Sequence, residues 1–130
     1  LMNVINETKP SLSDNINDRF AENPDVAIDY QGNIFVIWHS SGDILNSGTD
    51  RDIWMRAYYA VSKPGMFATN ILEWSDYISI SDAWNNNDGD SALVKIVTDF
   101  NGNIHIVWED FSDIINNGND KDIFYYILRH

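Results

Sequence analysis

The stretch DYQGNIFVIWHSSGDILNSGTDRDI at residues 29–53 recurs as DFNGNIHIVWEDFSDIINNGNDKDI at residues 99–123. The two stretches align without a gap at a constant offset of 70, and 12 of their 25 positions are identical. Repeats of this period are typical of arrays in which one unit cannot bury its own faces and stacks on its neighbour. The chain is therefore predicted to contain two copies of one structural unit.

Each copy contains three segments with the residue pattern of strands, separated by a Gly-Asn hairpin signal and then by a long polar loop. The segments cover residues 25–29, 34–38 and 52–59 in the first copy and 93–99, 104–108 and 122–128 in the second. The middle segment carries apolar residues on both of its alternating faces, which predicts that both faces are covered. Residues 73–81, EWSDYISIS, resemble a fourth strand. Because no window has helical periodicity, the fold class is predicted to be all-β, with four antiparallel strands per unit.

The second copy reaches His130, which aligns with Ala60, before a fourth strand begins. We expect residues 4–13 to supply that strand, because residues 10–14, PSLSD, resemble residues 78–82, ISISD. Pro10 is tolerable on an edge strand, where no donor is needed. The predicted organisation is a single unit over residues 1–130. Its parts are a closing strand at 4–13, a first four-stranded element at 24–81 and a second, three-stranded element at 92–130.

Composition excludes several classes of partner. A net charge of −12, with only eight basic residues, argues against nucleic acid and anionic membrane surfaces, which need clustered Lys and Arg. No apolar run approaches the roughly 18 residues of a membrane span, so no membrane insertion is expected. The chain has no Cys, which excludes disulfides and thiolate metal sites. An extracellular or cell-surface location is favoured.

The long loops at residues 40–52 and 110–122 are candidate Ca²⁺ sites, because hard cations prefer carboxylate, amide and carbonyl oxygens. The candidate ligands that recur in both copies are Asp43, Asn46, Asp50, Asp52, Asp113, Asn116, Asp120 and Asp122. Their spacing matches no EF-hand loop. The alternative is that Asp52 and Asp122 orient the start of a strand by accepting hydrogen bonds from backbone amides.

Aromatic residues near loops are the candidate ligand contacts. Trp84 lies beside the Asn- and Asp-rich segment 85–90, and Trp54 and Trp74 also lie close to loops. Trp38 and Trp108 sit within apolar strands and are predicted to pack in the core. Glu109 and Asp110 are adjacent, so their side chains should point to opposite faces of a strand, which does not suit paired-carboxylate catalysis.

The four-stranded units, the Gly-Asn hairpin, a Trp ending the second strand and Asp-Ile opening the third resemble the blades of sialidase-like (BNR-type) β-propellers. This resemblance covers residues 24–130 and implies blades arranged radially, with the first strand innermost and one blade closed by a strand from the opposite terminus. The sialidase motif Ser-x-Asp-x-Gly-x-x-Trp is only echoed at residues 47–54. No arginine cluster can be assigned from Arg19, Arg51, Arg56 and Arg129, and no Tyr–Glu pair can be placed. No catalytic residue is carried over.

Propellers have four to eight blades, whereas this chain supplies two. Because two blades alone would expose large apolar faces, we expect assembly with further copies, a trimer with six blades being favoured. The first hypothesis is a non-catalytic, self-assembling module that binds a glycan or protein ligand. The alternatives are a glycosidase- or sialidase-like enzyme with its pocket at the ring axis, and a structural element of a cell-surface scaffold.

Overall fold

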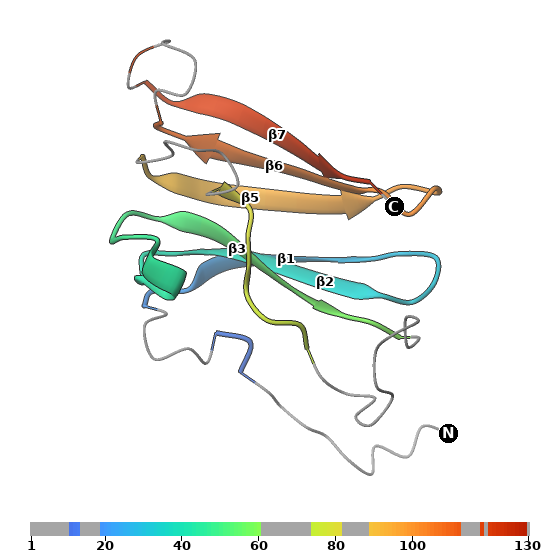
Figure 1. Ribbon diagram of the computed structural model, residues 1–130. Helices are drawn as coiled ribbons and strands as arrows, with labels where there is room; N and C mark the ends of the chain where they lie inside the picture. Colours follow the sequence, from blue (N-terminus) through green and yellow to red (C-terminus); the bar gives the residue numbers. More distant parts are fainter. Residues whose placement is uncertain are drawn as a thin grey trace.

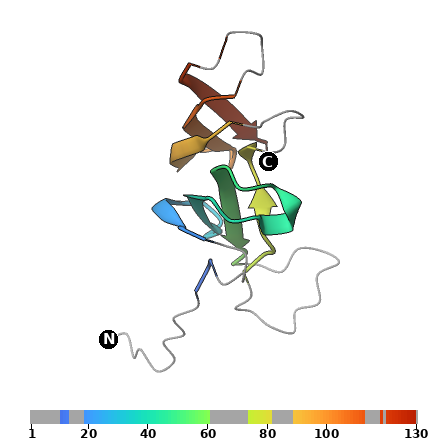
Figure 2. The ribbon, with the colours of Figure 1, turned by 90° about the vertical axis from the view of Figure 1, so that its left-hand side faces the viewer.

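The computed structural model describes residues 11–13, 19–60, 74–81, 89–112, 118 and 120–129. Two antiparallel sheets lie face to face (Figures 1 and 2). The first contains β1 (Glu22–Ile28), β2 (Ile34–Ser40), β3 (Asp52–Tyr58) and β4 (Ile78–Ser79), and the second contains β5 (Ser91–Thr98), β6 (Ile104–Asp110) and β7 (Asp122–Leu128). A 3-10 helix, η1 (Ile44–Asn46), lies between β2 and β3. Within the described ranges, no helix is long and apolar enough to cross a membrane.

The all-β prediction and the three-strand pattern of each copy are confirmed, whereas the fourth strand is much shorter than residues 73–81. It consists of β4 and one isolated pairing of Trp74 with Tyr58. Two serine hydroxyls replace backbone carbonyls along this edge: the Ala57 amide donates to Ser75 Oγ at 2.9 Å, and the Ile53 amide donates to Ser81 Oγ at 3.0 Å. Residues 4–10 of the predicted closing strand lie outside the described part of the chain.

Both copies make the same hairpin turn after their first strand. In the first copy, Asp29 Oδ1 accepts hydrogen bonds from the amides of Gln31 and Asn33, both at 2.9 Å. The Asn33 side-chain amide donates to Asp29 Oδ2 at 2.8 Å, and Gly32 takes a φ of +83°. This is the three-residue hairpin loop with glycine in the left-handed region. The identical Asp, Gly and Asn of the repeat are therefore explained by the turn.

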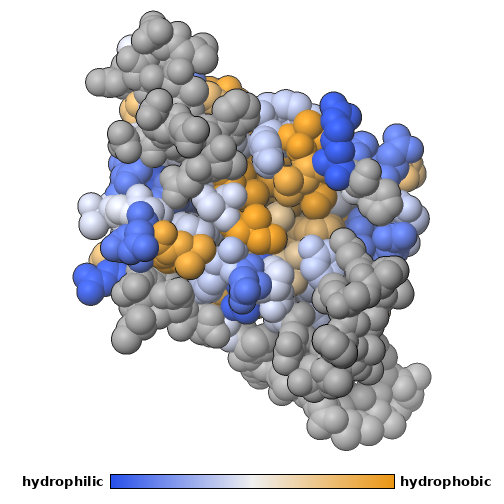
Figure 3. Space-filling model, in the orientation of Figure 1, coloured by the Kyte–Doolittle hydropathy of each residue, from blue (hydrophilic) through white to orange (hydrophobic). Residues whose placement is uncertain are grey.

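The core lies between the sheets, whose apolar side chains reach the surface along the seam in Figure 3. The first sheet contributes Ala27, Phe35, Ile37, Ile53, Met55 and Ala57, and the second contributes Val94, Ile96, Ile104, Ile106 and Trp108. Two hydrogen bonds also join the first strands of the sheets. The Ile96 amide donates to Asp25 Oδ2 at 3.0 Å, and Thr98 Oγ1 donates to the Ile28 carbonyl at 2.8 Å.

The sheets pack head to tail, because the two faces in contact are not equivalent in the repeat. Phe35, Ile37 and Met55 face the second sheet, but their equivalents at offset 70 are His105, Val107 and Tyr125, which point away from the first sheet. In each sheet, one face carries Phe35, Ile37 and Met55 or their equivalents, and the opposite face carries Ile104, Ile106 and Trp108 or their equivalents. Such an arrangement leaves one face of each kind without a sheet against it.

Two faces, one on each sheet, are directed away from the core between the sheets. The first outward face consists of Val26, Ile28, Ile34, Val36, Trp38, Trp54, Arg56 and Tyr58. The second outward face consists of Lys95, Val97, His105, Val107, Glu109, Ile123, Tyr125 and Ile127. The first is partly covered by Ile44 and Tyr77, which pack on Trp38 and Trp54. The expected cover on both faces of the middle strand is thus present for β2, whereas Val107 on β6 is 38% exposed.

Candidate functional site

A cleft of about 330 Å³ opens between the two sheets at the end that carries the hairpin turns. Its floor is apolar and is formed by Phe35, Met55, Ile78, Ile104 and Leu128. Its rim is polar and includes Asp29, Gln31, Asn33, Tyr59 and Arg129. A concave, mostly apolar space with a few polar groups is the usual form of a small-molecule site.

A second feature lies on the open side of the second sheet and consists of Asp99, His105 and Tyr125. His105 Nε2 lies 2.8 Å from Asp99 Oδ2, and His105 Nδ1 lies 2.7 Å from the Tyr125 hydroxyl oxygen. The imidazole and phenol rings stack with centroids 6.0 Å apart and an interplanar angle of 24°. The three side chains form a continuous hydrogen-bonded chain that ends on a phenol 53% exposed to solvent.

The carboxylate at the start of this chain is held in place by the hairpin turn. Asp99 Oδ1 accepts from the amides of Asn101 and Asn103 at 2.8 and 2.9 Å, and the Asn103 side chain donates to Oδ2 at 2.8 Å. The hydrogen bond from His105, followed by those from Asn103 and Asn101, holds the pKa of Asp99 well below its ordinary value. In the neutral tautomer with the proton on Nε2, His105 donates a hydrogen bond from Nε2 to the Asp99 carboxylate, and Nδ1 accepts one from the Tyr125 hydroxyl.

The first copy contains the turn but not the chain. Asp29 and Asn33 make the same bonds as Asp99 and Asn103, yet Phe35 and Met55 occupy the positions equivalent to His105 and Tyr125. In the first copy these two positions face the second sheet and belong to the core, whereas in the second copy they face outward. Neither His105 nor Tyr125 was among the residues predicted for a site, and the signal in the sequence is the departure of the second copy from the apolar pattern of the first.

A buried carboxylate marks the other end of β6. Asp110 is fully buried, and Oδ2 accepts from Trp108 Nε1 and from Ser91 Oγ, both at 2.7 Å. Oδ1 accepts from the Ser112 amide at 2.7 Å. These bonds tie the start of β5 to the end of β6, so Asp110 has a structural role rather than the exposed position of an acid catalyst.

Two of the candidate calcium ligands of the first loop accept hydrogen bonds from groups of the chain itself. Asp52 is buried and accepts from Ser81 Oγ at 3.1 Å, and Asp43 accepts from the Gly48 amide at 3.0 Å. Asn46 belongs to η1, and Asp50 follows it in the same loop. Across the described ranges, no group of three or more His, Cys, Asp or Glu side chains is placed to hold a metal ion.

The second loop is only partly described. Asp120 is exposed and Asp122 begins β7, whereas Asp113 and Asn116 lie outside the described residues. Calcium binding by the loops therefore stays a prediction. At the start of β3, the Ile53 amide donates to Ser81 Oγ, and this hydroxyl donates to Asp52 Oδ1, so the alternative role of Asp52 as a direct acceptor from backbone amides also stays a prediction.

The three candidate tryptophans have different surroundings. Trp54 is 1% exposed and contacts Tyr77 edge-to-face at 6.0 Å between centroids, so its ring is not open to a ligand. Trp74 is partly exposed and packs on Tyr58 at 5.7 Å. Trp84 lies outside the described residues. The predicted burial of Trp38 and Trp108 is confirmed, at 3% and 2% exposure.

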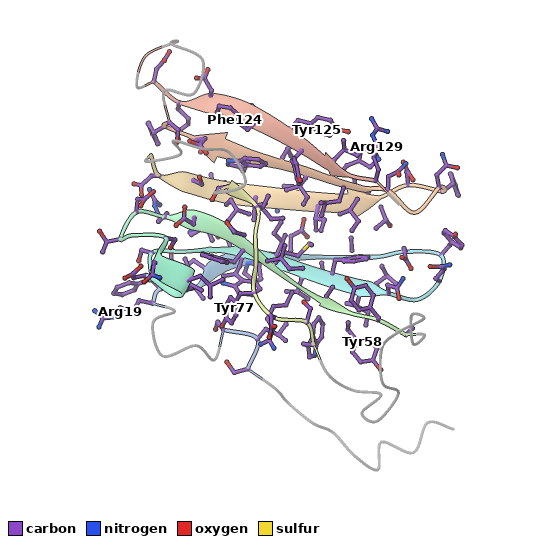
Figure 4. The ribbon with its side chains drawn as sticks, viewed as in Figure 1. Arg19, Tyr58, Tyr77, Phe124, Tyr125 and Arg129 are labelled. Atoms are coloured by element: carbon purple, nitrogen blue, oxygen red, sulfur yellow. The ribbon has the colours of Figure 1, made fainter. Side chains whose placement is uncertain are left out.

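The four arginines are dispersed. Arg51 pairs with Asp90 at 3.1 Å, and Arg56 lies 5.3 Å from the centre of the Tyr77 ring. Arg19 and Arg129 lie at opposite ends of the molecule in Figure 4. They form no cluster of the kind that would bind a substrate carboxylate.

No model of a known protein family, no curated protein and no solved structure matched this chain.

Proposed function

We propose that this chain is a self-assembling β-propeller module that binds a ligand, and that it associates head to tail with further copies until a ring closes. Three copies with two blades each would give six blades. The supporting observation is that the second outward face is the repeat equivalent of a face that the chain itself buries.

The internal contact between the sheets supplies the template for the contact between copies. Within the chain, Phe35, Ile37 and Met55 of one sheet pack against Ile104, Ile106 and Trp108 of the other. The equivalents of the first set lie on the second outward face, and the equivalents of the second set are Ile34, Val36 and Trp38 on the first outward face. A second copy therefore carries the surface that the second outward face requires. Contacts of this non-self-complementary kind close into rings or extend into filaments.

The exposure of apolar side chains favours this occupant. Val97 is 59% exposed and Ile123 is 71% exposed on the second outward face, while Val26 and Ile28 are 56% and 60% exposed on the first. Contiguous apolar surface of this sort marks an interaction site in soluble proteins. Because each copy carries a charge of −12, association should strengthen as added salt screens the repulsion between copies.

Solution mass tests the assembly. By light scattering, the intact chain should have the mass of three copies of 14.9 kDa, and Val107→Lys and Ile123→Lys should each reduce it to one copy. Phe100→Lys is the matched control, because Phe100 is fully exposed on the β5–β6 turn and lies off the second outward face. Folded wild-type protein with the mass of one copy at all concentrations would refute the assembly. A chain lacking residues 1–13 would test the closing strand, which should be needed for a stable ring.

Ligand binding is proposed for the clefts between sheets, where repeated sites around a ring would give avidity to weak contacts with a glycan or a protein. A glycan array tests the binding, and a panel of fluorogenic glycosides tests the alternative of a glycosidase. The dispersed arginines favour the binding module over sialidase-like chemistry. Absence of any ligand in both assays would favour the scaffold element instead.

A further inference from the structure

The geometry of Asp99, His105 and Tyr125 points to a chemical activity beyond ligand binding. Nucleophile activation requires a base within hydrogen-bonding reach of the nucleophile and a third group that orients the base. Here the distances are 2.7 Å from the Tyr125 hydroxyl oxygen to His105 Nδ1 and 2.8 Å from His105 Nε2 to Asp99. Both distances are within the range in which a proton can pass along the bond.

We propose that Tyr125 is an activated oxygen nucleophile that takes an acyl group from a small ester, with His105 as its general base and Asp99 as the positioning residue. The chain of bonds occurs in the second copy, where these positions face outward, and not in the first copy, where they face the second sheet. Phe35 and Met55 fill the equivalent positions of the first copy, so an apolar pair serves the same strands there.

In the proposed step, an acyl group passes from the ester to the phenol oxygen of Tyr125. The phenol oxygen of Tyr125 attacks the carbonyl carbon of the ester while its proton passes to His105 Nδ1. The ester bond to the alcohol or phenol part of the donor then breaks, and His105 returns the proton to a leaving alkoxide or releases it to water. The product is an O-acyl-tyrosine, with no oxidant, reductant or metal required. Asp99 stabilises the imidazolium that exists during the step.

The position of the site leaves it accessible to a small molecule. Tyr125 projects from the outward side of β7 (Figure 4), and its side chain is 53% exposed in the single copy. Phe35 and Met55 line the cleft between the two sheets. Because Phe35 and Met55 are only 5% and 2% exposed, their equivalents His105 and Tyr125 would be largely enclosed at the junction with the next copy in the assembly proposed above, so the open form of the site belongs to the single copy. All three residues of the chain belong to one copy, so the chemistry itself does not rest on that assembly.

Acetylation by p-nitrophenyl acetate tests the proposal on the full-length chain at neutral pH, at a protein concentration at which light scattering gives the mass of one copy. The rate of acetyl transfer to each tyrosine is measured by mass spectrometry of its peptide. Tyr30 is the internal standard, because it is 63% exposed, more than Tyr125 at 53%, and lies on the hairpin turn of the first copy. We expect Tyr125 to react about 10²-fold faster than Tyr30, the size of a typical general-base contribution.

The variants separate the roles of the three residues. His105→Phe, which copies the residue of the first unit, should fold and should lower the Tyr125 rate to that of Tyr30. Asp99→Asn should lower it in part, whereas Asp29→Asn weakens the matching turn of the first copy and should leave it unchanged. Equal rates at Tyr125 and Tyr30, an unchanged rate in His105→Phe, or p-nitrophenol release that persists in Tyr125→Phe would each overturn the proposal. Light scattering of the same samples reports on assembly separately.

Discussion

The buried Asp110 carboxylate offers a sharp test of how the second sheet is held together. Asp110→Asn keeps the shape of the side chain but replaces one acceptor oxygen with an amino group. The hydroxyl of Ser91 can reorient to accept from that group, but the Trp108 indole N–H and the Ser112 amide can only donate. Whichever way the amide is turned, one of these two buried donors loses its acceptor and faces another donor.

The expected cost follows from these bonds. A hydrogen bond to a charged acceptor contributes about 1.5–3 kcal/mol, and the donor left without a partner adds its own desolvation penalty. We therefore expect Asp110→Asn to lower the free energy of unfolding by about 3 kcal/mol, which for a chain of this length is a fall in Tm of roughly 10 °C. Urea unfolding followed by tryptophan fluorescence measures the change, and the m-value should not move.

Two further variants test whether the loss of stability comes from the hydrogen bonds of Asp110. Asp76→Asn changes an exposed carboxylate in the same way and should shift stability by less than about 0.5 kcal/mol. In a Trp108→Phe background, Asp110→Asn should cost less, because one of the two fixed donors is gone. A cost for Asp110→Asn no larger than that of Asp76→Asn would refute the role assigned to this carboxylate.

Two more predictions concern Gly89 and Asp90, which lead into β5. A Cβ on Gly89 would lie 2.5 Å from the Ser112 amide nitrogen and 2.6 Å from the Phe111 carbonyl carbon. We therefore expect Gly89→Ala to lower the free energy of unfolding in urea by about 1–3 kcal/mol. An unchanged urea midpoint would show that the loop accommodates the Cβ without a measurable loss of stability. Hydrogen bonds from Arg51 lower the pKa of Asp90 below its ordinary 3.8, so their contribution is complete above that value and is lost as pH falls through the depressed pKa. Because both side chains are about 40% exposed, we expect wild type to exceed Arg51→Gln by at most about 1 kcal/mol near neutrality, and a stability difference that persists in strong acid would contradict this cause.

Local patterns made much of the fold predictable. The alternation of apolar residues located six of the seven strands, and the repeated Asp, Gly and Asn marked both hairpins, because these signals depend on neighbours in the chain. The fourth strand was predicted over residues 73–81 but pairs in interrupted fashion. Its pairing depends on Ser75 and Ser81 hydroxyls and on Tyr77 packing over Trp38, contacts that join distant residues.

The candidate site was less predictable for the same reason. His105 and Tyr125 are 20 residues apart, and only the antiparallel register of β6 and β7 brings them onto neighbouring positions of one face. Asp99 joins them because the turn that precedes β6 aims its carboxylate back along the strand. Trp54 was predicted to contact a ligand because it lies close to a loop in the sequence, but in the folded chain it is buried beneath Tyr77.

The sequence by itself determined that the chain has two equivalent sheets, each with the same turn and the same apolar strands, because a 70-residue repeat with period-two alternation leaves little else possible. Only the tertiary structure decided that the two sheets stack head to tail, burying Phe35 and Met55 while leaving His105 and Tyr125 open. The strands of the two copies differ at Phe35/His105 and Met55/Tyr125, but such differences within a strand do not by themselves give the order in which the sheets stack. That choice depends on the twist of each sheet and on the order in which the chain lays one sheet upon the other.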